Sequence, residues 1–421
     1  MMSNLRNCFF GTDTLISTHC GFTSRVYLNN AATPLAAKPA IQELYKTLPI
    51  YSYGNEPNAL SAQFASKYNE VRDIVMDFIS ADPSLDTVIY TSTTTSAINI
   101  LSQVYYEHDP DQVILTTRME HMANYLPFRE KMKTLLVGLT PDGNVDMNDY
   151  AAKLKQYSGQ IKLVAVTGAS NITGIIPPFY DMAAMAHSHG AKILVDAVQL
   201  VQHKSFTMKP HDDASHIDFV SFDGHKFYTG QSGGVLVGDR VFLDQYKPLM
   251  YGAGITEFVS NSKIIYKSSP ERYEAGYPHF LGIISLGAAI RFLNEIGMKN
   301  VEEWERRLYR HLIRRLSQIP NLILYGDVYN NTRTPFAAFN LKDMSYQTLA
   351  NRLGYGYGIN IGSGTNGSNL YVQDLLGLTD EQAFSLYRSG EGYGIVRASI
   401  GLFNNYDDID RLADALFSIS S

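Results

Sequence analysis

The run VSFDGHKFYTGQSGGVLVG, from Val220 to Gly238, carries the strongest signal in this chain. It is typical of a short apolar strand, one lysine (Lys226), and a glycine-rich turn that leads into a second apolar strand. Upstream, the apolar run KILVDAVQ ends its predicted strand with an aspartate, Asp196. A lone lysine after a buried strand is usually a surface residue. A strand-end lysine that follows a strand-end aspartate indicates a cofactor-binding site.

This pair matches the needs of pyridoxal 5'-phosphate (PLP). The lysine forms a Schiff base with the cofactor, and the carboxylate partners the pyridinium nitrogen. That ion pair keeps the ring nitrogen protonated, so the ring accepts electrons from a substrate carbanion. We therefore predict PLP as the cofactor, with Lys226 and Asp196 as catalytic residues.

The order of the other segments predicts an α/β fold. From about residue 86 to residue 238, short apolar strands alternate with amphipathic helices. Runs of Ile, Val and Leu without alternation indicate a mostly parallel sheet flanked by helices. Beyond it come a long helical stretch, Ser285 to Gln318, a few strands and a final helix. We expect an N-terminal extension (1–25), a large PLP-binding domain (26–285) and a smaller α+β domain (286–421).

Composition limits the partners and the location. The 421 residues carry a net charge of −6 and no basic stripe stands out, which argues against a nucleic-acid partner. No apolar run reaches the ~18 residues that span a membrane, and the N-terminus lacks a signal-peptide apolar region. We expect a cytoplasmic protein without membrane contact. The two cysteines, Cys8 and Cys20, match no metal-site spacing, so we interpret them as free thiols and expect no metal.

Further candidate ligands lie where predicted strands end. The junction YTSTTTSAIN (Tyr90 to Asn99) offers hydroxyls and backbone N–H groups at a helix N-terminus, which bind phosphate, although threonines there also act as ordinary N-caps. Arg397, inside the apolar run GYGIVRASIGLF, offers a guanidinium to an amino-acid carboxylate. The remaining candidates are His121 to stack on the ring, Asn171 and Gln199 to reach its O3′, and His225 to touch the phosphate.

Eight ordered segments resemble one family: YLNNAATP, YTSTTTSAIN, MEHMANYLPF, SNITG, ILVDAVQ, SFDGHKFYTG, RYEAGYP and VRASIGLFNN. They are similar to the class V aminotransferase superfamily of PLP fold type I, and most of all to its cysteine desulfurase/selenocysteine lyase branch, over roughly residues 26 to 420. The resemblance implies a homodimer with active sites at the subunit interface. It also implies roles: Lys226, Asp196 and His121 in catalysis; Thr94, Thr95, Asn171, Gln199, His225 and Tyr277 around the cofactor; Arg397 and Asn30 at the substrate.

Three departures from the family bear on function. Relatives carry a nucleophilic cysteine in a segment resembling R-x-G-x-x-C, where this chain has Gly362 for the arginine and Gly367 for the cysteine. A desulfurase needs a thiolate to take sulfur as a persulfide. Asp223 replaces a small hydroxyl residue two positions before His225, and an anion beside a phosphate is unfavourable unless it points away or is bridged. Tyr277 replaces a phosphate-binding threonine.

We therefore favour a PLP-dependent enzyme acting on a small amino acid, as a cysteine-type C–S (β-) lyase without persulfide relay. Lys226 would remove the Cα proton of a substrate held by Arg397, and a leaving group on Cβ would then depart without any thiol. The alternatives are transamination, epimerisation, desulfuration through an unrecognised thiol, or a non-catalytic PLP-binding scaffold. The sequence leaves the substrate, any sulfur acceptor, and the roles of the Gly362–Gly367 loop, Asp223 and both cysteines open.

Overall fold

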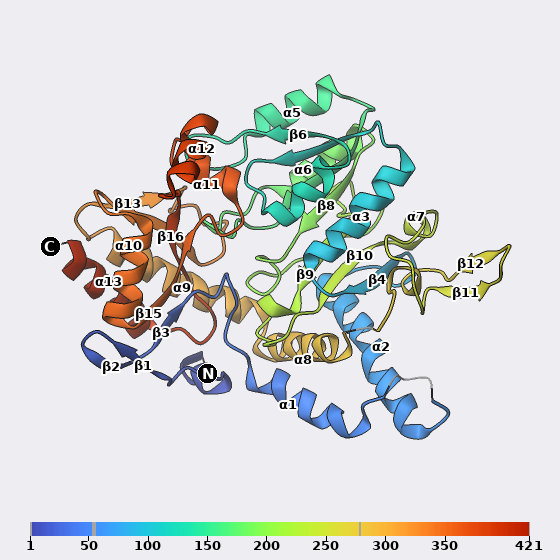
Figure 1. The fold of residues 1–421 in the computed structure, drawn as a ribbon, viewed down its shortest axis with the longest axis horizontal. Coiled ribbons are helices and arrows are strands. Elements are labelled where there is room, and N and C mark those ends of the chain that lie inside the picture. Colours follow the sequence, from blue (N-terminus) through green and yellow to red (C-terminus); the bar gives the residue numbers. More distant parts are fainter. Residues whose placement is uncertain (1, 53–55, 278, 421) are drawn as a thin grey trace.

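The computed structural model describes residues 2–52, 56–277 and 279–420. Its centre is a seven-stranded sheet in the order β4-β10-β9-β8-β7-β5-β6 (Figure 1). β10 is antiparallel to both of its neighbours, and the other strands run parallel. The strands are β4 (Asp86–Thr91), β5 (Val113–Thr117), β6 (Lys133–Val137), β7 (Ile161–Thr167), β8 (Lys192–Asp196), β9 (Phe219–Asp223) and β10 (Gly234–Asp239). The predicted α/β class is confirmed.

Both faces of this sheet are buried, as the unbroken apolar runs predicted. In β8, Ile193 and Val195 join one apolar core while Leu194 joins another on the opposite face, because successive side chains of a strand point to opposite sides. The first core contains residues of α2 (Ala59–Ile79), α5 (Met147–Gln156), α6 (Phe179–Ser188) and α8 (Phe280–Ile296). The second contains residues of α3 (Thr94–His108).

A second sheet organises the C-terminal part, in the order β13-β14-β16-β15-β3. Its strands are β13 (Leu322–Tyr325), β14 (Phe336–Leu341), β16 (Ile395–Ser399), β15 (Ile359–Gly364) and β3 (Val26–Leu28). A separate apolar core packs this sheet against α9 (Met298–Leu316) and α13 (Tyr406–Ser420). β3 pairs with β15 in parallel, so a strand from the N-terminal part of the chain completes the C-terminal sheet.

The helical stretch expected from Ser285 to Gln318 is two helices. α8 and α9 meet at an angle of 79°. Gly297 lies between them with φ +84°, a conformation that residues with a Cβ avoid and that ends a helix. The expected domain boundary at residue 286 falls inside α8, whose buried residues belong to the core of the large sheet. The domain division stays a proposal, with α9 as the natural start of the smaller part.

Shorter elements complete the chain. At the N-terminus lie η1 (Met2–Cys8), β1 (Leu15–Thr18) and β2 (Gly21–Ser24); Cys8 is partly buried, and Cys20 is exposed in the β1–β2 turn. A hairpin of β11 (Thr256–Val259) and β12 (Ile264–Tyr266) projects from the body (Figure 1). The other helices are α1 (Lys38–Thr47), α4 (Leu126–Arg129), α7 (Arg240–Leu243), α10 (Tyr346–Asn351), α11 (Asn369–Leu375) and α12 (Asp380–Ser389).

Among the described residues, no single helix is long and apolar enough to cross a membrane. The bent pair α8 and α9 passes the same test of length and composition when its two members are taken together. Most of α8 lies within the core of the large sheet, which accounts for its apolar composition.

We expect the buried ion pair Arg72–Glu274 to be a major support of the large domain. Arg72 donates two hydrogen bonds of 2.9 Å to the Glu274 carboxylate, which also accepts the Tyr90 N–H at 2.7 Å. Glu274→Gln leaves the guanidinium uncompensated, so the free energy of unfolding should fall by about 3 kcal/mol in urea denaturation. Glu70→Gln, which breaks the exposed pair with Arg291, is the control and should cost less than about 0.5 kcal/mol. Equal effects would contradict this role.

Candidate active site

A pocket of ≈ 390 Å³ lies at the carboxyl ends of the large-sheet strands, beside the N-terminus of α3. Such strand ends are where open α/β sheets bind ligands. The pocket brings together nine of the predicted site residues, which come from segments far apart in the sequence: Thr94, Thr95, His121, Asn171, Asp196, Gln199, His225, Lys226 and Arg397. Asn30 and Tyr277 do not line it.

Lys226 ends the single turn η4 (Gly224–Lys226) that follows β9. Its Nζ donates to the backbone oxygens of Ala31, at 2.8 Å, and Ala32, which hold the amine at the pocket wall. Burial and then the positive charge of Arg397 lower the pKa of Lys226 to about 7. At neutral pH a large share of the side chain is therefore a neutral amine, the form that attacks a carbonyl or accepts a proton.

Asp196 is the last residue of β8 and is buried in the pocket floor. Its Oδ1 accepts a hydrogen bond from the Val198 N–H at 3.2 Å. Burial raises the pKa of Asp196 to about 6, because no cation lies within ion-pair distance of it among the described residues. A protonated pyridine nitrogen would supply the missing charge, which fits the predicted pairing with the ring.

His121 precedes the turn η3 (Met122–Asn124), and its Nδ1 accepts the Ala123 N–H at 3.1 Å. Burial and then the charge of Lys226 lower its pKa to about 4, so the imidazole is neutral and suited to stacking. Sequence reasoning missed Glu120, the residue before it. Glu120 is buried, binds Thr117 and Asn124, and has a pKa raised by burial to about 8. Its place in the MEHMAN segment was the available signal.

The loop that contains Gly367 rests directly on the His121 ring. A Cβ built on Gly367 would lie 2.2 Å from His121 Nε2, and Gly367 has a φ of +79°. The Met122 N–H donates to the Gly367 carbonyl at 2.7 Å. Any side chain at this position, a cysteine included, would require the loop or the ring to move.

Asn171 holds the same loop. Its Nδ2 donates to the Asn366 carbonyl at 2.8 Å, and its Oδ1 accepts from Ser368 Oγ at 2.6 Å. Both ends of the amide are therefore engaged by the loop. The expected contact between Asn171 and O3′ would require this arrangement to open, whereas Gln199 Oε1 is buried without a partner and needs no such change.

Arg397, on β16, is 1% exposed, yet no carboxylate lies within ion-pair distance of it among the described residues. Its Nη1 donates to the Asn171 carbonyl at 2.6 Å and its Nη2 to Asn29 Oδ1 at 3.0 Å, while Nε has no acceptor. Burial lowers its pKa to about 10, so the guanidinium stays charged at neutral pH. Gly362 gives it room, since a Cβ there would lie 2.9 Å from Nη2.

Two expected site residues lie elsewhere. The Asn30 side chain points into the interior, where its Nδ2 donates to the Ser399 carbonyl at 2.8 Å and to Asn404 at 3.1 Å. Its neighbour Asn29 does not line the pocket either, but its Oδ1 accepts the hydrogen bond from Arg397 Nη2. Tyr277 is 58% exposed outside the pocket, and its hydroxyl pairs with the Tyr51 hydroxyl.

Asp223 occupies the end of the pocket where phosphate was expected. The carboxylate is fully buried and accepts the Thr94 N–H at 3.1 Å, at the N-terminus of α3. It also accepts the His225 N–H at 3.0 Å, and His225 Nδ1 lies 2.7 Å from Oδ1. Burial by itself raises the pKa of Asp223, but these contacts with His225 and Thr94 hold that pKa below its usual value. One donor of the predicted phosphate site is thus already taken by an anion.

The remaining groups fit PLP. Thr94 Oγ1, Gln199 Oε1 and Arg397 Nε are buried and have no hydrogen-bond partner among the residues that the structure describes, and all three residues line the pocket. Buried polar atoms without a hydrogen bond indicate a ligand, because buried polar groups almost always have a hydrogen-bond partner. Lys226, Asp196 and His121 would hold the ring. Thr94, Thr95 and His225 would hold the phosphate beside Asp223.

Comparison with known proteins identifies relatives of this chain. The family model described as Aminotransferase class-V matches residues 26–412. A probable cysteine desulfurase from Halalkalibacterium halodurans is 31% identical over 402 residues, which cover 93% of this chain and 92% of that protein. A cysteine desulfurase from Yersinia pseudotuberculosis is 32% identical over 416 residues, with coverages of 96% and 95%.

Solved structures agree with the fold. The apo structure of a cysteine desulfurase from Thermococcus onnurineus matches with a TM-score of 0.83 at 26% identity, over 94% of each chain. The cysteine desulfurase CsdA of Escherichia coli, in an S-sulfonic acid form, matches with a TM-score of 0.84 over 100% of this chain and 99% of its own. Its identity of 24% shows the likeness of fold alone.

We expect Asp223 to weaken the binding of the cofactor phosphate. Asp223→Ser removes a like charge and frees the Thr94 N–H, so PLP should bind to the apoenzyme about tenfold more tightly or better, as measured by equilibrium dialysis. Pyridoxal, which lacks the phosphate, should bind both proteins equally. Asp239→Ser, which removes the N-cap carboxylate of α7 far from the pocket lining, is the matched control. Weaker PLP binding by Asp223→Ser would show instead that the carboxylate bridges to phosphate through His225.

Proposed function

Since the chain belongs to the class V aminotransferase family and is a PLP-dependent enzyme, we propose that it acts on cysteine or a similar small amino acid as a C–S (β-) lyase without a persulfide relay. The observation that carries this proposal is the contact of Gly367 with His121, because a side chain at this position, where relatives carry their nucleophilic thiol, would require the loop or the ring to move. The chain's two cysteines lie elsewhere. Cys8 ends η1, Cys20 is in the β1–β2 turn, and neither lines the pocket.

In such a reaction each of the pocket residues would have a separate role. Bound PLP supplies an electron sink for the charge that develops at Cα. Arg397 binds the substrate carboxylate with its charged and partly unpaired guanidinium. Lys226, neutral near pH 7, accepts the Cα proton, and Asp196 keeps the ring nitrogen protonated. Loss of the Cβ sulfur as sulfide leaves an enamine, which takes up water to give pyruvate and ammonia.

The names of the relatives favour a second candidate, cysteine desulfuration. That reaction transfers sulfur to an enzyme thiolate and leaves alanine rather than pyruvate. In this chain the thiolate would have to be Cys8 or Cys20. Transamination, epimerisation and a non-catalytic scaffold remain without an observation in their favour.

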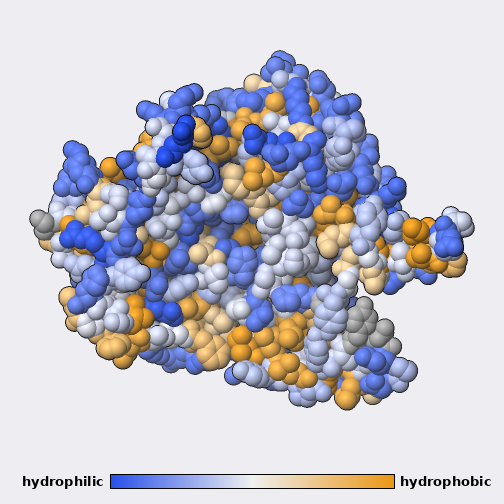
Figure 2. Space-filling view, viewed as in Figure 1, coloured by the Kyte–Doolittle hydropathy of each residue, from blue (hydrophilic) through white to orange (hydrophobic). Residues whose placement is uncertain are grey.

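A homodimer is part of the proposal. The β11–β12 hairpin exposes Phe258, Val259, Ile264 and Ile265, although a two-stranded hairpin has little stability without a packing partner. Figure 2 shows apolar surface over this hairpin and along the edge where α1 and α8 lie. Exposed apolar patches of this kind mark protein–protein contacts. The cytoplasmic location expected from the sequence stays a prediction.

A cysteine-free variant separates the two candidate reactions. Cys8→Ser/Cys20→Ser should release sulfide and pyruvate from L-cysteine as fast as the natural chain, because the proposed elimination uses no thiol. Lys226→Ala, the matched negative control, should lose about 10² to 10⁴-fold in rate. The products are measured as sulfide, pyruvate and alanine in the same reaction. Alanine formation that disappears in the cysteine-free variant would overturn the lyase proposal in favour of desulfuration.

The depressed pKa of Lys226 predicts how the apoenzyme takes up PLP. Only the neutral amine attacks the cofactor aldehyde, and Lys226 loses its proton near pH 7 rather than at the ordinary lysine value of 10.5. The rate of covalent PLP attachment, followed by absorbance, should therefore rise with pH and level off above about pH 7 to 8. In Arg397→Gln, which removes the neighbouring charge, the midpoint should move to higher pH. A midpoint near 10 in the natural chain would contradict the burial argument.

A further inference from the structure

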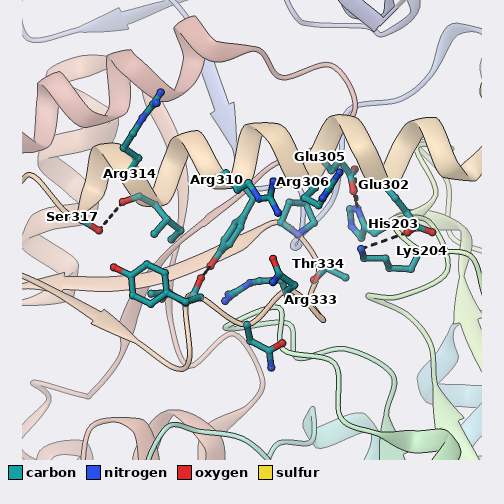
Figure 3. A pocket seen from close by; sticks show the side chains of 17 residues that line it. His203, Lys204, Glu302, Glu305, Arg306, Arg310, Arg314, Ser317, Arg333 and Thr334 are labelled. Atoms are coloured by element: carbon teal, nitrogen blue, oxygen red, sulfur yellow. Dashed lines mark hydrogen bonds and ion pairs between the residues drawn. The ribbon is translucent and has the colours of Figure 1, made fainter.

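A second cavity, of ≈ 460 Å³, lies between α9 and the segment from Val328 to Pro335 (Figure 3). Its volume falls within the range of about 300 to 1,000 Å³ that is usual for small-molecule sites. It shares no lining residue with the PLP pocket. Nothing in the proposed reaction uses it.

Cationic side chains dominate its walls. Arg306, Arg310 and Arg314 are spaced four residues apart on α9, which brings all three to one face of the helix. The net charge of −6 and the absence of an evident basic stripe did not predict this row, because the three arginines share one face only in the helical conformation. The other charged lining residues are Lys204, Arg333, Glu302 and Glu305.

The carboxylates of the cavity are already engaged. Glu305 contacts His203 Nδ1 at 2.9 Å in the interior, and Glu302 lies 3.6 Å from Lys204 Nζ. Neither carboxylate lies within ion-pair distance of a cavity arginine. Of the α9 row, Arg306 alone has an acidic partner, Glu303, which lies outside the cavity lining.

Two of the α9 arginines that line the cavity, Arg310 and Arg314, have no acidic partner among the described residues. Arg314 Nη2 bonds only to the His311 ring, at 2.6 Å. The Arg310 side chain makes no hydrogen bond or ion pair within the part of the chain that the structure describes. Figure 3 shows Arg310 beside Arg306, whereas the Arg314 side chain extends from the helix on the side away from Arg333.

Arg333, on the opposite wall, is a buried cation without a counter-ion. It is 6% exposed, and its guanidinium donates to the carbonyls of Asp327, Phe336 and Thr173. Its Nε has no acceptor among the described residues, and the Tyr309 ring lies 4.2 Å from the guanidinium carbon. Burying a cation without a carboxylate is costly, and a bound anion would offset that cost.

We propose that this cavity binds a nucleoside di- or triphosphate. Arg306 to Arg314 span eight residues of helix, about 12 Å, which exceeds the size of one phosphate or carboxylate and suits a chain of phosphates. Guanidinium groups are the preferred bidentate partners of phosphate oxygens. Ile313, Val328 and the ring of Tyr329, which is 76% exposed, offer an apolar surface for a flat base.

Titration calorimetry on the PLP-loaded protein tests this site, with ATP, ADP, pyrophosphate and adenosine as probes. ATP and ADP should bind one per chain, pyrophosphate more weakly, and adenosine not measurably. Arg310→Ala/Arg314→Ala should weaken ATP binding by about tenfold or more, since it removes two cationic side chains at exposed positions that form no ion pair among the described residues. The matched control is Arg307→Ala, on the same helix but paired with Glu303 outside the cavity; it should change ATP binding by less than about twofold.

Three results would overturn the proposal. The first is no ATP binding at any ionic strength tested, and the second is equal weakening by Arg307→Ala, which would mean unspecific attraction. The third is binding of an acidic peptide such as hexaglutamate as tightly as ATP, which would assign the cavity to acidic polypeptides. The readout is binding rather than turnover, so these results leave the lyase proposal untouched.

Discussion

The burial of two cations in one pocket constrains the rest of this structure. Lys226 and Arg397 face the same space with no carboxylate bound to either, and each loses the solvation that water would give it. Burial and the neighbouring guanidinium drive the lysine toward its neutral form, whereas the guanidinium, with its much higher intrinsic pKa, keeps its charge. One buried residue is thus suited to act as a base and the other to bind an anion, and neither has a carboxylate partner among the described residues.

Anionic groups are placed around this pair without touching it. Asp196 lies beneath the expected ring position, and Asp223 lies at the opposite end of the pocket, held by Thr94 and His225. Neither forms an ion pair with Lys226 or Arg397. If Asp223 bound Lys226 directly, the carboxylate would raise the pKa of Lys226 again. The lysine would then be charged, and unreactive, at neutral pH.

Local sequence predicted much of this arrangement because the relevant side chains follow directly from strand ends. Lys226, Asp196 and His121 lie where buried strands stop, and the sheet brings those ends together. Prediction failed where contacts are long-range or where adjacent residues point to opposite sides. Asn30 and Asn29 differ by one position, and only Asn29 contacts Arg397. The binding of Asn171 to the loop at residues 366–368 joins segments far apart in the chain. The break between α8 and α9 depended on the single residue Gly297.

The pairing of β3 with β15 has a consequence for how the chain is made. Residues 26–28 leave the ribosome early, but their partner strand, residues 359–361, emerges only after most of the protein has been synthesised. The C-terminal sheet therefore cannot close during synthesis of the large domain, and β3 must stay unpaired with β15 until β15 has been synthesised. Arg397, on β16 next to β15, acquires its final position only when this late sheet is complete. The half of the pocket that contains Arg397 is consequently the last part of the enzyme to form.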